Sequence, residues 1–245
     1  IFGFVALIWY GHSKKINGWQ IMDSAAPAML LGYGMGRIGC QMAGDGDWGI
    51  FNSAYITNRF GAMVPATPLQ YKATLKINQG YFQEMSGNFA KIPHARFPQP
   101  HWLGFLPDWL FAYNYPHNIN NNGIPLNSCL GPHCSVLPVA VFPTPLYELL
   151  MCLILFVILL GLRKRIRIPG MIFAIYLVMT GAERFLIETI RVNNRYHFFG
   201  ISPTQAEVIS PILVLVGLGL IWYVSKKHPS KPVITPTPPA REAQP

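Results

Sequence analysis

The chain has 245 residues, of which 51% are hydrophobic and only 12% are charged, and its formal net charge is +9. A soluble domain has about 25% charged residues, so the composition argues against an ordinary soluble enzyme and indicates a polytopic membrane protein. The basic residues gather on alternate connections between apolar segments, which is the positive-inside pattern, and they therefore do not indicate a nucleic-acid-binding protein. These basic clusters are Lys14 and Lys15, then Arg163, Lys164, Arg165 and Arg167, then Lys226 and Lys227.

The first apolar segment, residues 1–10, is short. It has about half of the roughly 20 residues that span a bilayer, and neither an initiator Met nor a basic region precedes it. We expect the chain to begin inside a helix, and the natural protein to have more sequence before Ile1. The basic turn after this segment places the helix exit in the cytosol.

The second segment, about residues 21–43, is expected to return outward as a glycine-rich helix. Gly32, Gly36 and Gly39 would form a small-residue face along which helices pack closely in lipid. The same segment contains Arg37. A guanidinium at membrane depth costs about 3 to more than 10 kcal/mol, so it normally has a partner or an anionic ligand. The anion that a membrane offers is a lipid phosphate.

Residues 49–143 have no apolar run long enough to span a bilayer and are expected to form a mostly irregular external insertion with short elements. Its aromatic residues have two possible roles: they lie on the membrane interface, or they form the core of a small head. Cys129 and Cys134 favour a disulfide in an oxidising compartment, and a metal site with His133 is the weaker alternative. The aromatic residues are Trp102, Phe105, Trp109, Phe111, Tyr113 and Tyr115.

Three further helices are expected at residues 146–162, 170–191 and 203–224, the last with Ser202 or Thr204 as its N-cap. The Pro- and Thr-rich end of the chain is typical of disorder. The expected fold is thus an all-α polytopic membrane protein, a transmembrane helix bundle with a periplasmic insertion. Its parts are residues 1–48 and 144–227 in the membrane, a periplasmic head at 49–143, and a disordered cytoplasmic tail at 228–245.

Charged residues from separate segments are expected at one depth. Arg184, Glu188 and Arg191 are spaced i, i+4, i+7 and would share one face of an apolar helix. At 1.5 Å per residue, Arg184 lies about 21 Å from a helix start near Gly170, and Arg37 lies about 21 Å from Asp23. Both heights fall in the outer half of a hydrocarbon core of roughly 30 Å. The acidic and aromatic residues expected at the same level are Asp45, Asp47, Trp48, Tyr147 and Glu148.

With these residues assembled, the sequence resembles the prolipoprotein diacylglyceryl transferase family, bacterial inner-membrane enzymes that lipidate lipoprotein precursors. The family's Gly-Arg-x-Gly-Asn-Phe-x-Asn-x-Glu block, followed by Trp-Gly, corresponds to residues 36–49. Its His-Pro-x-Gln-Leu-Tyr-Glu block corresponds to residues 142–148, and its Arg-x-x-x-Glu-x-x-Arg helix to residues 184–191. A Gln that opens the last helix corresponds to Gln205. The matches are in order and cover about residues 1–225 apart from the insertion.

The chain also departs from the family pattern. The family's two Asn positions are Cys40 and Ala43, and the His of the second block is Phe142. Asp45 and Asp47 compete for the acidic position of the first block. The family's His-Gly-Gly motif, with its proposed catalytic histidine, is expected just before Ile1.

The resemblance implies transfer of the sn-1,2-diacylglyceryl group from phosphatidylglycerol to the lipobox cysteine of a prolipoprotein, with release of glycerol-1-phosphate. It implies an active site that faces the outer leaflet of the inner membrane. Catalytic roles are expected for Arg37, Arg184 and Glu188, and Glu188 would orient Arg184 or Arg191. Phosphatidylglycerol would be bound by Arg37, Arg184, Arg191, Asp45, Asp47, Gly49, Tyr147 and Glu148.

No metal or nucleotide motif is present in the sequence, so no cofactor is expected. The expected partners are phosphatidylglycerol, the prolipoprotein signal peptide with its lipobox, and the lipid bilayer. Two other classes remain open. One is a non-catalytic phospholipid-binding or transport membrane protein. The other is an ion or anion transporter, although the sequence has no inverted repeat of the kind that many transporters contain.

Overall fold

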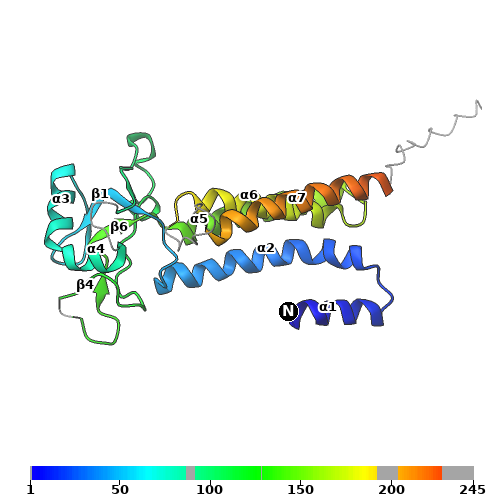
Figure 1. Ribbon diagram of the computed structural model, residues 1–245, viewed down its shortest axis with the longest axis horizontal. Helices are drawn as coiled ribbons and strands as arrows, with labels where there is room; N and C mark the ends of the chain where they lie inside the picture. The colour runs from blue at the N-terminus through cyan, green and yellow to red at the C-terminus, as the bar shows by residue number, and fades with distance from the viewer. Residues whose placement is uncertain (1, 87–91, 128, 192–203, 228–245) are drawn as a thin grey trace, which may run out of the picture.

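The computed structural model describes residues 2–86, 92–127, 129–191 and 204–227. The molecule is elongated, with a head of sheet and short helices at one end and a bundle of long helices at the other (Figure 1). The bundle contains α1 (Phe2–Ser13), α2 (Gly18–Ala43), α5 (Thr144–Arg165), α6 (Met171–Glu188) and α7 (Gln205–Lys227). Each helix expected from the sequence is therefore present. The tail at 228–245 and the possible cap Ser202 lie outside the described residues.

Within the described part of the chain, α5 and α7 are the helices long and apolar enough to cross a membrane. At 1.5 Å per residue, the 22 residues of α5 extend about 33 Å, close to the hydrocarbon thickness of a bilayer. Its basic residues, Arg163 to Arg165, lie in the last turn, far from the head. The other long helices are more polar: α2 contains Asp23 and Arg37, and α6 contains three charged residues in its last two turns.

Side chains from elsewhere in the chain fix where two of these helices begin. Both carboxylate oxygens of Asp23 on α2 accept backbone N–H groups at the start of α6, from Gly170 at 2.6 Å and Phe173 at 2.8 Å. Free N–H groups at a helix start need such acceptors. At the start of α7, Thr204 and Glu207 cap each other's backbone N–H, so Thr204 is confirmed as the cap. The contact through Asp23 aligns α2 and α6 at their ends farthest from the head.

Glycines allow close contacts between helices of the bundle, but these glycines differ from the ones that the sequence predicted. A Cβ on Gly34 would lie 2.8 Å from the Cβ of Cys152 on α5, and one on Gly181 would lie 2.9 Å from the carbonyl oxygen of Ser210 on α7. At Gly32, Gly36 and Gly39, a Cβ would meet no described atom within 4 Å. The expected small-residue face was therefore wrong in register, because the contact with α5 falls between these positions.

The head is more ordered than expected, and the chain is not all-α. Strand β1 (Phe51–Thr57) pairs antiparallel with β2 (Met63–Pro65) and β6 (Val139–Val141), and parallel with β3 (His94–Ala95). In register, Tyr55 lies opposite Pro65 and Phe51 opposite Val141. Helices α3 (Pro68–Ile77) and α4 (Gln79–Ser86) pack beside this sheet. A separate hairpin joins β4 (Ile124–Pro125) to β5 (Ser135–Val136), and beside it Cys129 and Cys134 form a disulfide.

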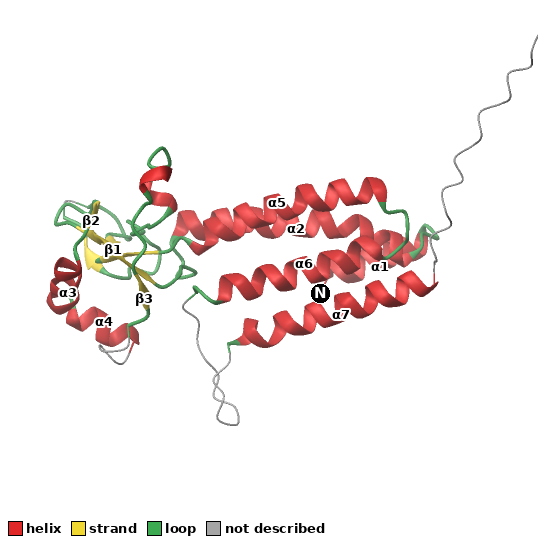
Figure 2. Cartoon of the chain, turned by 90° about the horizontal axis from the view of Figure 1, so that it is seen from above, coloured by secondary structure: helices red, strands yellow, loops and turns green. Residues whose placement is uncertain are grey.

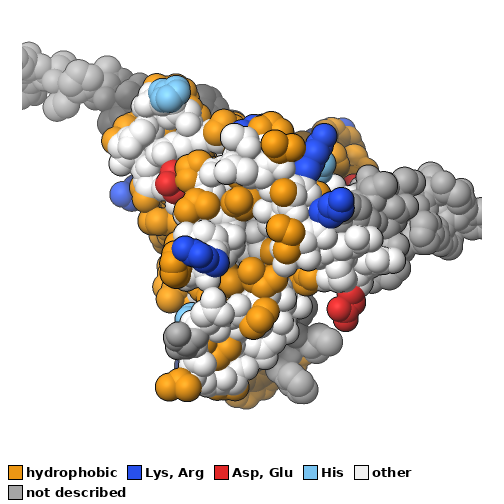
Figure 3. Space-filling view, turned by 90° about the vertical axis from the view of Figure 1, so that its left-hand side faces the viewer, with side chains coloured by type: hydrophobic (Ala, Val, Ile, Leu, Met, Phe, Trp, Pro, Cys, Tyr) orange, Lys and Arg blue, Asp and Glu red, His pale blue; other side chains and the backbone are white. Residues whose placement is uncertain are grey.

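The aromatic residues of the head divide into buried and exposed ones. Tyr115 and Phe111 are buried, and Tyr115 packs in a core with Trp48, Phe51 and Phe82. Trp102, Phe105 and Trp109 are exposed; they lie on or between two short helical turns, η2 (His101–Leu103) and η3 (Asp108–Leu110). On the end of the head farthest from the bundle, apolar side chains are scattered among polar and basic ones (Figure 3).

Candidate functional site

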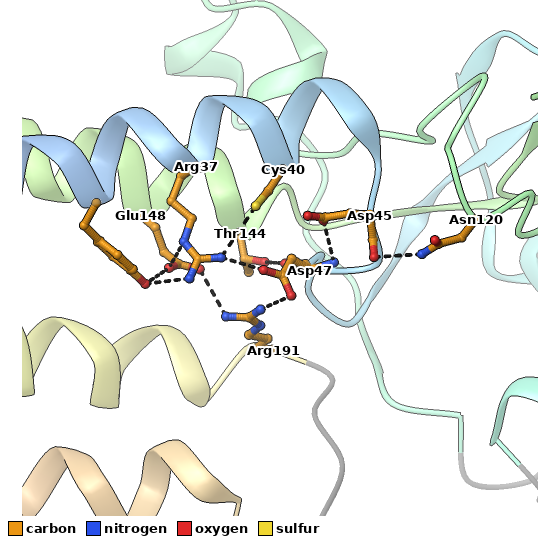
Figure 4. A network of polar contacts seen from close by, with 9 residues as sticks. Arg37, Cys40, Asp45, Asp47, Asn120, Thr144, Glu148 and Arg191 are labelled. Atoms are coloured by element: carbon orange, nitrogen blue, oxygen red, sulfur yellow. Dashed lines mark hydrogen bonds and ion pairs between the residues drawn. The ribbon is translucent and has the colours of Figure 1, made fainter. Parts of the chain in front are cut away.

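A network of two arginines, two carboxylates and a tyrosine lies where the bundle meets the head (Figure 4). Arg37 approaches from α2 and Arg191 from the loop just after α6, and the carboxylates of Asp47 and Glu148 lie between them. The four charges balance. Glu148 is buried, Arg37 and Arg191 are partly buried, and Asp47 is the most exposed of the four, so the network opens toward solvent on the side of Asp47.

Arg37 has a partner for every nitrogen of its guanidinium. Its Nε lies 2.8 Å from Glu148 Oε2, its Nη1 lies 2.5 Å from Asp47 Oδ2, and its Nη2 donates to the hydroxyl of Tyr33 at 2.8 Å. The Tyr33 hydroxyl in turn donates to Glu148. This chain of charge-assisted hydrogen bonds holds the arginine in place in a partly buried setting, where an unpaired charge would be costly.

Tyr33 also connects Arg37 to Arg184. The guanidinium carbons lie 4.7 Å (Arg37) and 5.1 Å (Arg184) from the centre of the Tyr33 ring, within the range of cation–π contacts. The common depth expected for the two arginines is thus confirmed. The cause is the contact between Asp23 on α2 and Gly170 at the start of α6, which aligns the two helices. Arg37 follows Asp23 by the same number of residues as Arg184 follows Gly170.

Arg191 reaches the network from a loop, not from a helix. The helix expected to run to Arg191 ends at Glu188, so Arg184, Glu188 and Arg191 do not form one continuous helical face. Arg191 forms an isolated antiparallel bridge with Gly49, and the N–H of Ile50 donates to the carbonyl of Ile190 at 2.9 Å. These contacts place the Arg191 guanidinium against Asp47 and, at 3.5 Å, against Glu148 Oε1.

Gly49 permits this approach because it has no side chain. A Cβ at Gly49 would lie 2.7 Å from the carbonyl oxygen of Ile190 and 2.9 Å from the methyl carbon of Thr144. The first of these atoms belongs to the backbone and cannot move aside without moving the loop. Thr144 also donates its hydroxyl to the carbonyl of Asp47 at 2.8 Å, which ties this turn to the start of α5.

The structure separates the two aspartates that the sequence left in competition. Asp47 contacts both arginines, whereas Asp45 shapes the turn: its Oδ1 accepts the N–H of Asp47 at 3.2 Å, and its carbonyl accepts from Asn120 at 2.7 Å. Burial acts to raise the pKa of Asp47, but the guanidinium of Arg191, then that of Arg37, outweighs it and holds the pKa below its usual value. Asp47 is therefore an anion at neutral pH.

Other expected residues lie elsewhere or have a different setting. The Tyr147 hydroxyl donates to the carbonyl of Leu110 at 2.8 Å, which directs it into the head and away from the arginines. The Glu188 side chain is buried in the last turn of α6. The Glu183 side chain is 1% exposed, and neither of its carboxylate oxygens has a hydrogen-bond partner among the described residues.

Two of these residues, Tyr33 and Glu183, were missed in the sequence. The feature of the sequence that could have indicated Tyr33 is its position one helical turn before an arginine in a glycine-rich apolar helix. Glu183 stands directly before Arg184 on the same apolar helix, where every ionisable residue is a candidate for a site.

A metal ion is a poor ligand for this site. Cys40 Sγ and carboxylate oxygens of Asp45 and Asp47 lie within 4.8 Å of one another. However, both oxygens of Asp47 already face arginines, and a nitrogen of Arg37 lies 3.9 Å from the sulfur. A cation there would be repelled by two guanidinium groups.

The fold and site define a mostly helical, membrane-associated protein with an arginine–carboxylate network where the helix bundle meets the head. Residues 1–223 match the family model of prolipoprotein diacylglyceryl transferase. The chain belongs to this family, which is a family of bacterial membrane enzymes.

Curated relatives agree with that assignment. A phosphatidylglycerol–prolipoprotein diacylglyceryl transferase of Xylella fastidiosa (strain M12) is 25% identical over 237 residues, which cover 96% of this chain and 62% of the relative. Proteins of the same name from Oceanobacillus iheyensis and Symbiobacterium thermophilum are 26% identical over 224 residues and 30% identical over 142 residues. These alignments cover 91% of this chain and 55% of the Oceanobacillus protein, and 57% of this chain and 45% of the Symbiobacterium protein. The chain thus spans about 62% of the length of the first of these relatives.

Proposed function

We propose that this chain carries the phosphate-binding part of the active site of a phosphatidylglycerol–prolipoprotein diacylglyceryl transferase. In this reaction the sulfur of a lipobox cysteine forms a bond to the sn-3 carbon of the diacylglyceryl group, and the bond from that carbon to the phosphate oxygen breaks. Glycerol-1-phosphate leaves, and the thiol proton is transferred to solvent or to the released phosphate. Negative charge builds on the leaving phosphate, so the protein's main task is to stabilise that charge.

The observation that carries the proposal is the bridging of Arg37 and Arg191 by Asp47. A carboxylate and a phosphodiester both present two oxygens that accept hydrogen bonds from guanidinium groups. Asp47 is the most exposed member of the network, with 36% of its side chain accessible, whereas Glu148 is 2% exposed. The lipid phosphate would take the place of Asp47 between the arginines, while Glu148 and Tyr33 keep Arg37 oriented.

Arg184 would supply a third positive charge near the network, because its guanidinium also lies over the ring of Tyr33. With a phosphate in place of Asp47, Arg37 and Arg191 would contact it directly, Arg184 would add to the positive potential, and Glu148 would reduce the repulsion between Arg37 and Arg191. Glu188 would act as a positioning residue at the end of α6. Asp45 and Gly49 would shape the turn that presents Asp47 and Arg191, and we assign Tyr147 to the junction with the head.

The direction of the site follows from the topology. The network lies at the end of α5 beside the head, and the basic last turns of α5 and α7 lie at the other end. Basic residues favour the cytosolic side. The proposal therefore places the protein as a multi-pass protein of the bacterial inner membrane, with the head in the periplasm and the site facing the outer leaflet. The lipobox of the prolipoprotein would approach from that side.

The test is a transfer assay with the full-length protein in vesicles that contain labelled phosphatidylglycerol, together with a lipobox peptide. Arg37→Ala should lower kcat by about 10²- to 10³-fold, the loss typical of removing one charge-stabilising donor. Arg59→Ala is the matched control, because Arg59 also lies over an aromatic ring, that of Phe60 at 5.0 Å, but in the head. No transfer by the wild-type protein would refute the enzyme assignment, and full activity of Arg37→Ala would refute the role of Arg37.

A further inference from the structure

We propose that residues 97–110, the aromatic loop, rest on the outer surface of the phospholipid bilayer and set the height of the head above it. Three large aromatic side chains project from this loop. Trp102 is 77% exposed, Phe105 is 79% exposed and Trp109 is 47% exposed. Such a cluster is far more than the single exposed apolar residue that needs no explanation.

Both ends of the loop are attached to the point where the head meets α5. At the first end, the ring of Phe97 packs against that of Phe142, which precedes α5, with centroids 6.5 Å apart. At the other end, the carbonyl of Leu110 accepts the hydroxyl of Tyr147 from the first turn of α5. Figure 2 shows that this end of α5 lies against the head.

That attachment fixes the depth of the loop. Because α5 is long and apolar enough to span a membrane and its basic end lies farthest from the head, its first turn marks the outer boundary of the hydrocarbon. Trp and aromatic residues gather at this boundary, where an apolar ring meets lipid and a polar edge meets water. The aromatic loop is level with it.

The loop holds the rings in a fixed arrangement. The side chain of Gln99 donates to the carbonyls of Leu103, at 3.0 Å, and Leu106, and the N–H of Gln99 donates to the Tyr55 hydroxyl at 2.9 Å. Backbone bonds close both helical turns, from Leu103 N–H to Pro100 O at 2.9 Å and from Leu110 N–H to Pro107 O at 3.1 Å. A preordered surface loses little conformational freedom when it meets a partner.

The head also has an exposed aromatic ring outside the aromatic loop, at Phe60. Phe60 is as exposed as Trp102, at 75%, but it lies in the turn between β1 and β2 and has Arg59 over its ring. It therefore makes a matched control: a ring of the same exposure in the same head, outside the loop attached to α5.

The test is site-directed spin labelling of the full-length protein in phosphatidylglycerol–phosphatidylethanolamine vesicles. Trp102→Cys, Phe105→Cys and Phe60→Cys are labelled separately, and the unsubstituted chain gives the background from the native cysteines. We expect relaxation at positions 102 and 105 to respond more to oxygen, which partitions into lipid, than to an aqueous nickel chelate. Position 60 should show the reverse.

Three outcomes would overturn the proposal. Accessibility of positions 102 and 105 to the nickel chelate equal to that of position 60 would show that the loop faces water. If protection of these positions from the nickel chelate grows with the protein-to-lipid ratio, the partner of the loop is a second copy of the chain. Protection only after a lipobox peptide is added would identify the loop as a substrate contact. Using two label positions keeps the test valid if one substitution prevents folding.

Discussion

The head and the bundle bury polar side chains for opposite purposes. In the head, the buried polar residues are neutral and well bonded: Asn52 makes four hydrogen bonds, to or from Phe97, Phe111 and Ala54. In the bundle and at Arg191, they include charged groups that keep unbonded atoms. Among the described residues, these atoms are Glu148 Oε1, Thr180 Oγ1, both carboxylate oxygens of Glu183, Arg191 Nε and Ser210 Oγ.

This difference separates architecture from function. Buried polar groups that are fully bonded specify one structure, while unbonded ones are costly and need a reason. In the head, Tyr71 Oη and His133 Nδ1 are the described exceptions, whereas two of the unbonded atoms outside the head, Glu148 Oε1 and Arg191 Nε, belong to the arginine network itself. We therefore predict that the head is the more rigid part and that a ligand binds at the junction.

The largest expected effect comes from breaking the buried ion pairs. Glu148→Gln removes the carboxylate that faces both Arg37 and Arg191 and leaves their charges poorly compensated. Loss of one partner of a buried pair costs about 3–5 kcal/mol. The thermal unfolding temperature of Glu148→Gln in detergent should therefore be much lower than that of the wild type.

The matched change in the head is Asn52→Ala, which leaves several backbone groups without hydrogen-bond partners. Each buried group left unpaired costs about 1–3 kcal/mol of stability. The substitution should open the head to protease and leave phosphatidylglycerol binding nearly unchanged. If Asn52→Ala weakens lipid binding as much as Glu148→Gln does, the division between head and junction is wrong.

A gain in stability is expected at Glu183. Its carboxyl group is buried without hydrogen-bond partners among the described residues, so replacing it by an apolar residue removes a burial penalty of about 1–3 kcal/mol. Glu183→Leu should raise the unfolding temperature. Glu84→Leu, at an exposed position of α4, should change stability by less than about 0.5 kcal/mol. A fall in stability of Glu183→Leu would mean that the carboxyl group has a partner in the working protein.

The smallest expected effect is on the pH dependence of stability. The folded-state pKa of Asp47 is lowered, so its contribution is present above the usual carboxyl pKa of about 4 and is lost as pH falls through the lower folded value. Asp47→Asn should make the melting temperature less dependent on pH below about 4. Asp108→Asn, in the head, is the control. Identical acid profiles for wild type and Asp47→Asn would contradict the ion pairs of Asp47 with Arg37 and Arg191.

The sequence predicted the long helices and the common depth of Arg37 and Arg184, because both depend on spacing along a helix. It could not predict the hub role of Tyr33, since that depends on which way α2 turns toward α5. The same rotation explains why Gly34, rather than Gly32 or Gly36, contacts α5.

The path of Arg191 was also beyond the sequence. The i, i+4, i+7 spacing from Arg184 to Arg191 fits one helix. However, the helix ends at Glu188, and Arg191 forms a backbone bridge with Gly49 instead. In the head, the short strands were missed because each has few residues and gains its order from pairing with β1. Long-range pairing of this kind leaves little pattern in a single sequence.

The most direct test of the central claim is the preference of the protein for a phosphate. Dioctanoyl phosphatidylglycerol and uncharged dioctanoylglycerol would be titrated into the purified protein by calorimetry. Each hydrogen bond to a charged group contributes about 1.5–3 kcal/mol, so wild type should bind the phospholipid at least about tenfold more tightly. Arg191→Gln should lose most of that preference, and Arg59→Ala should keep it. Equal binding of the two lipids by the wild-type protein would contradict the account.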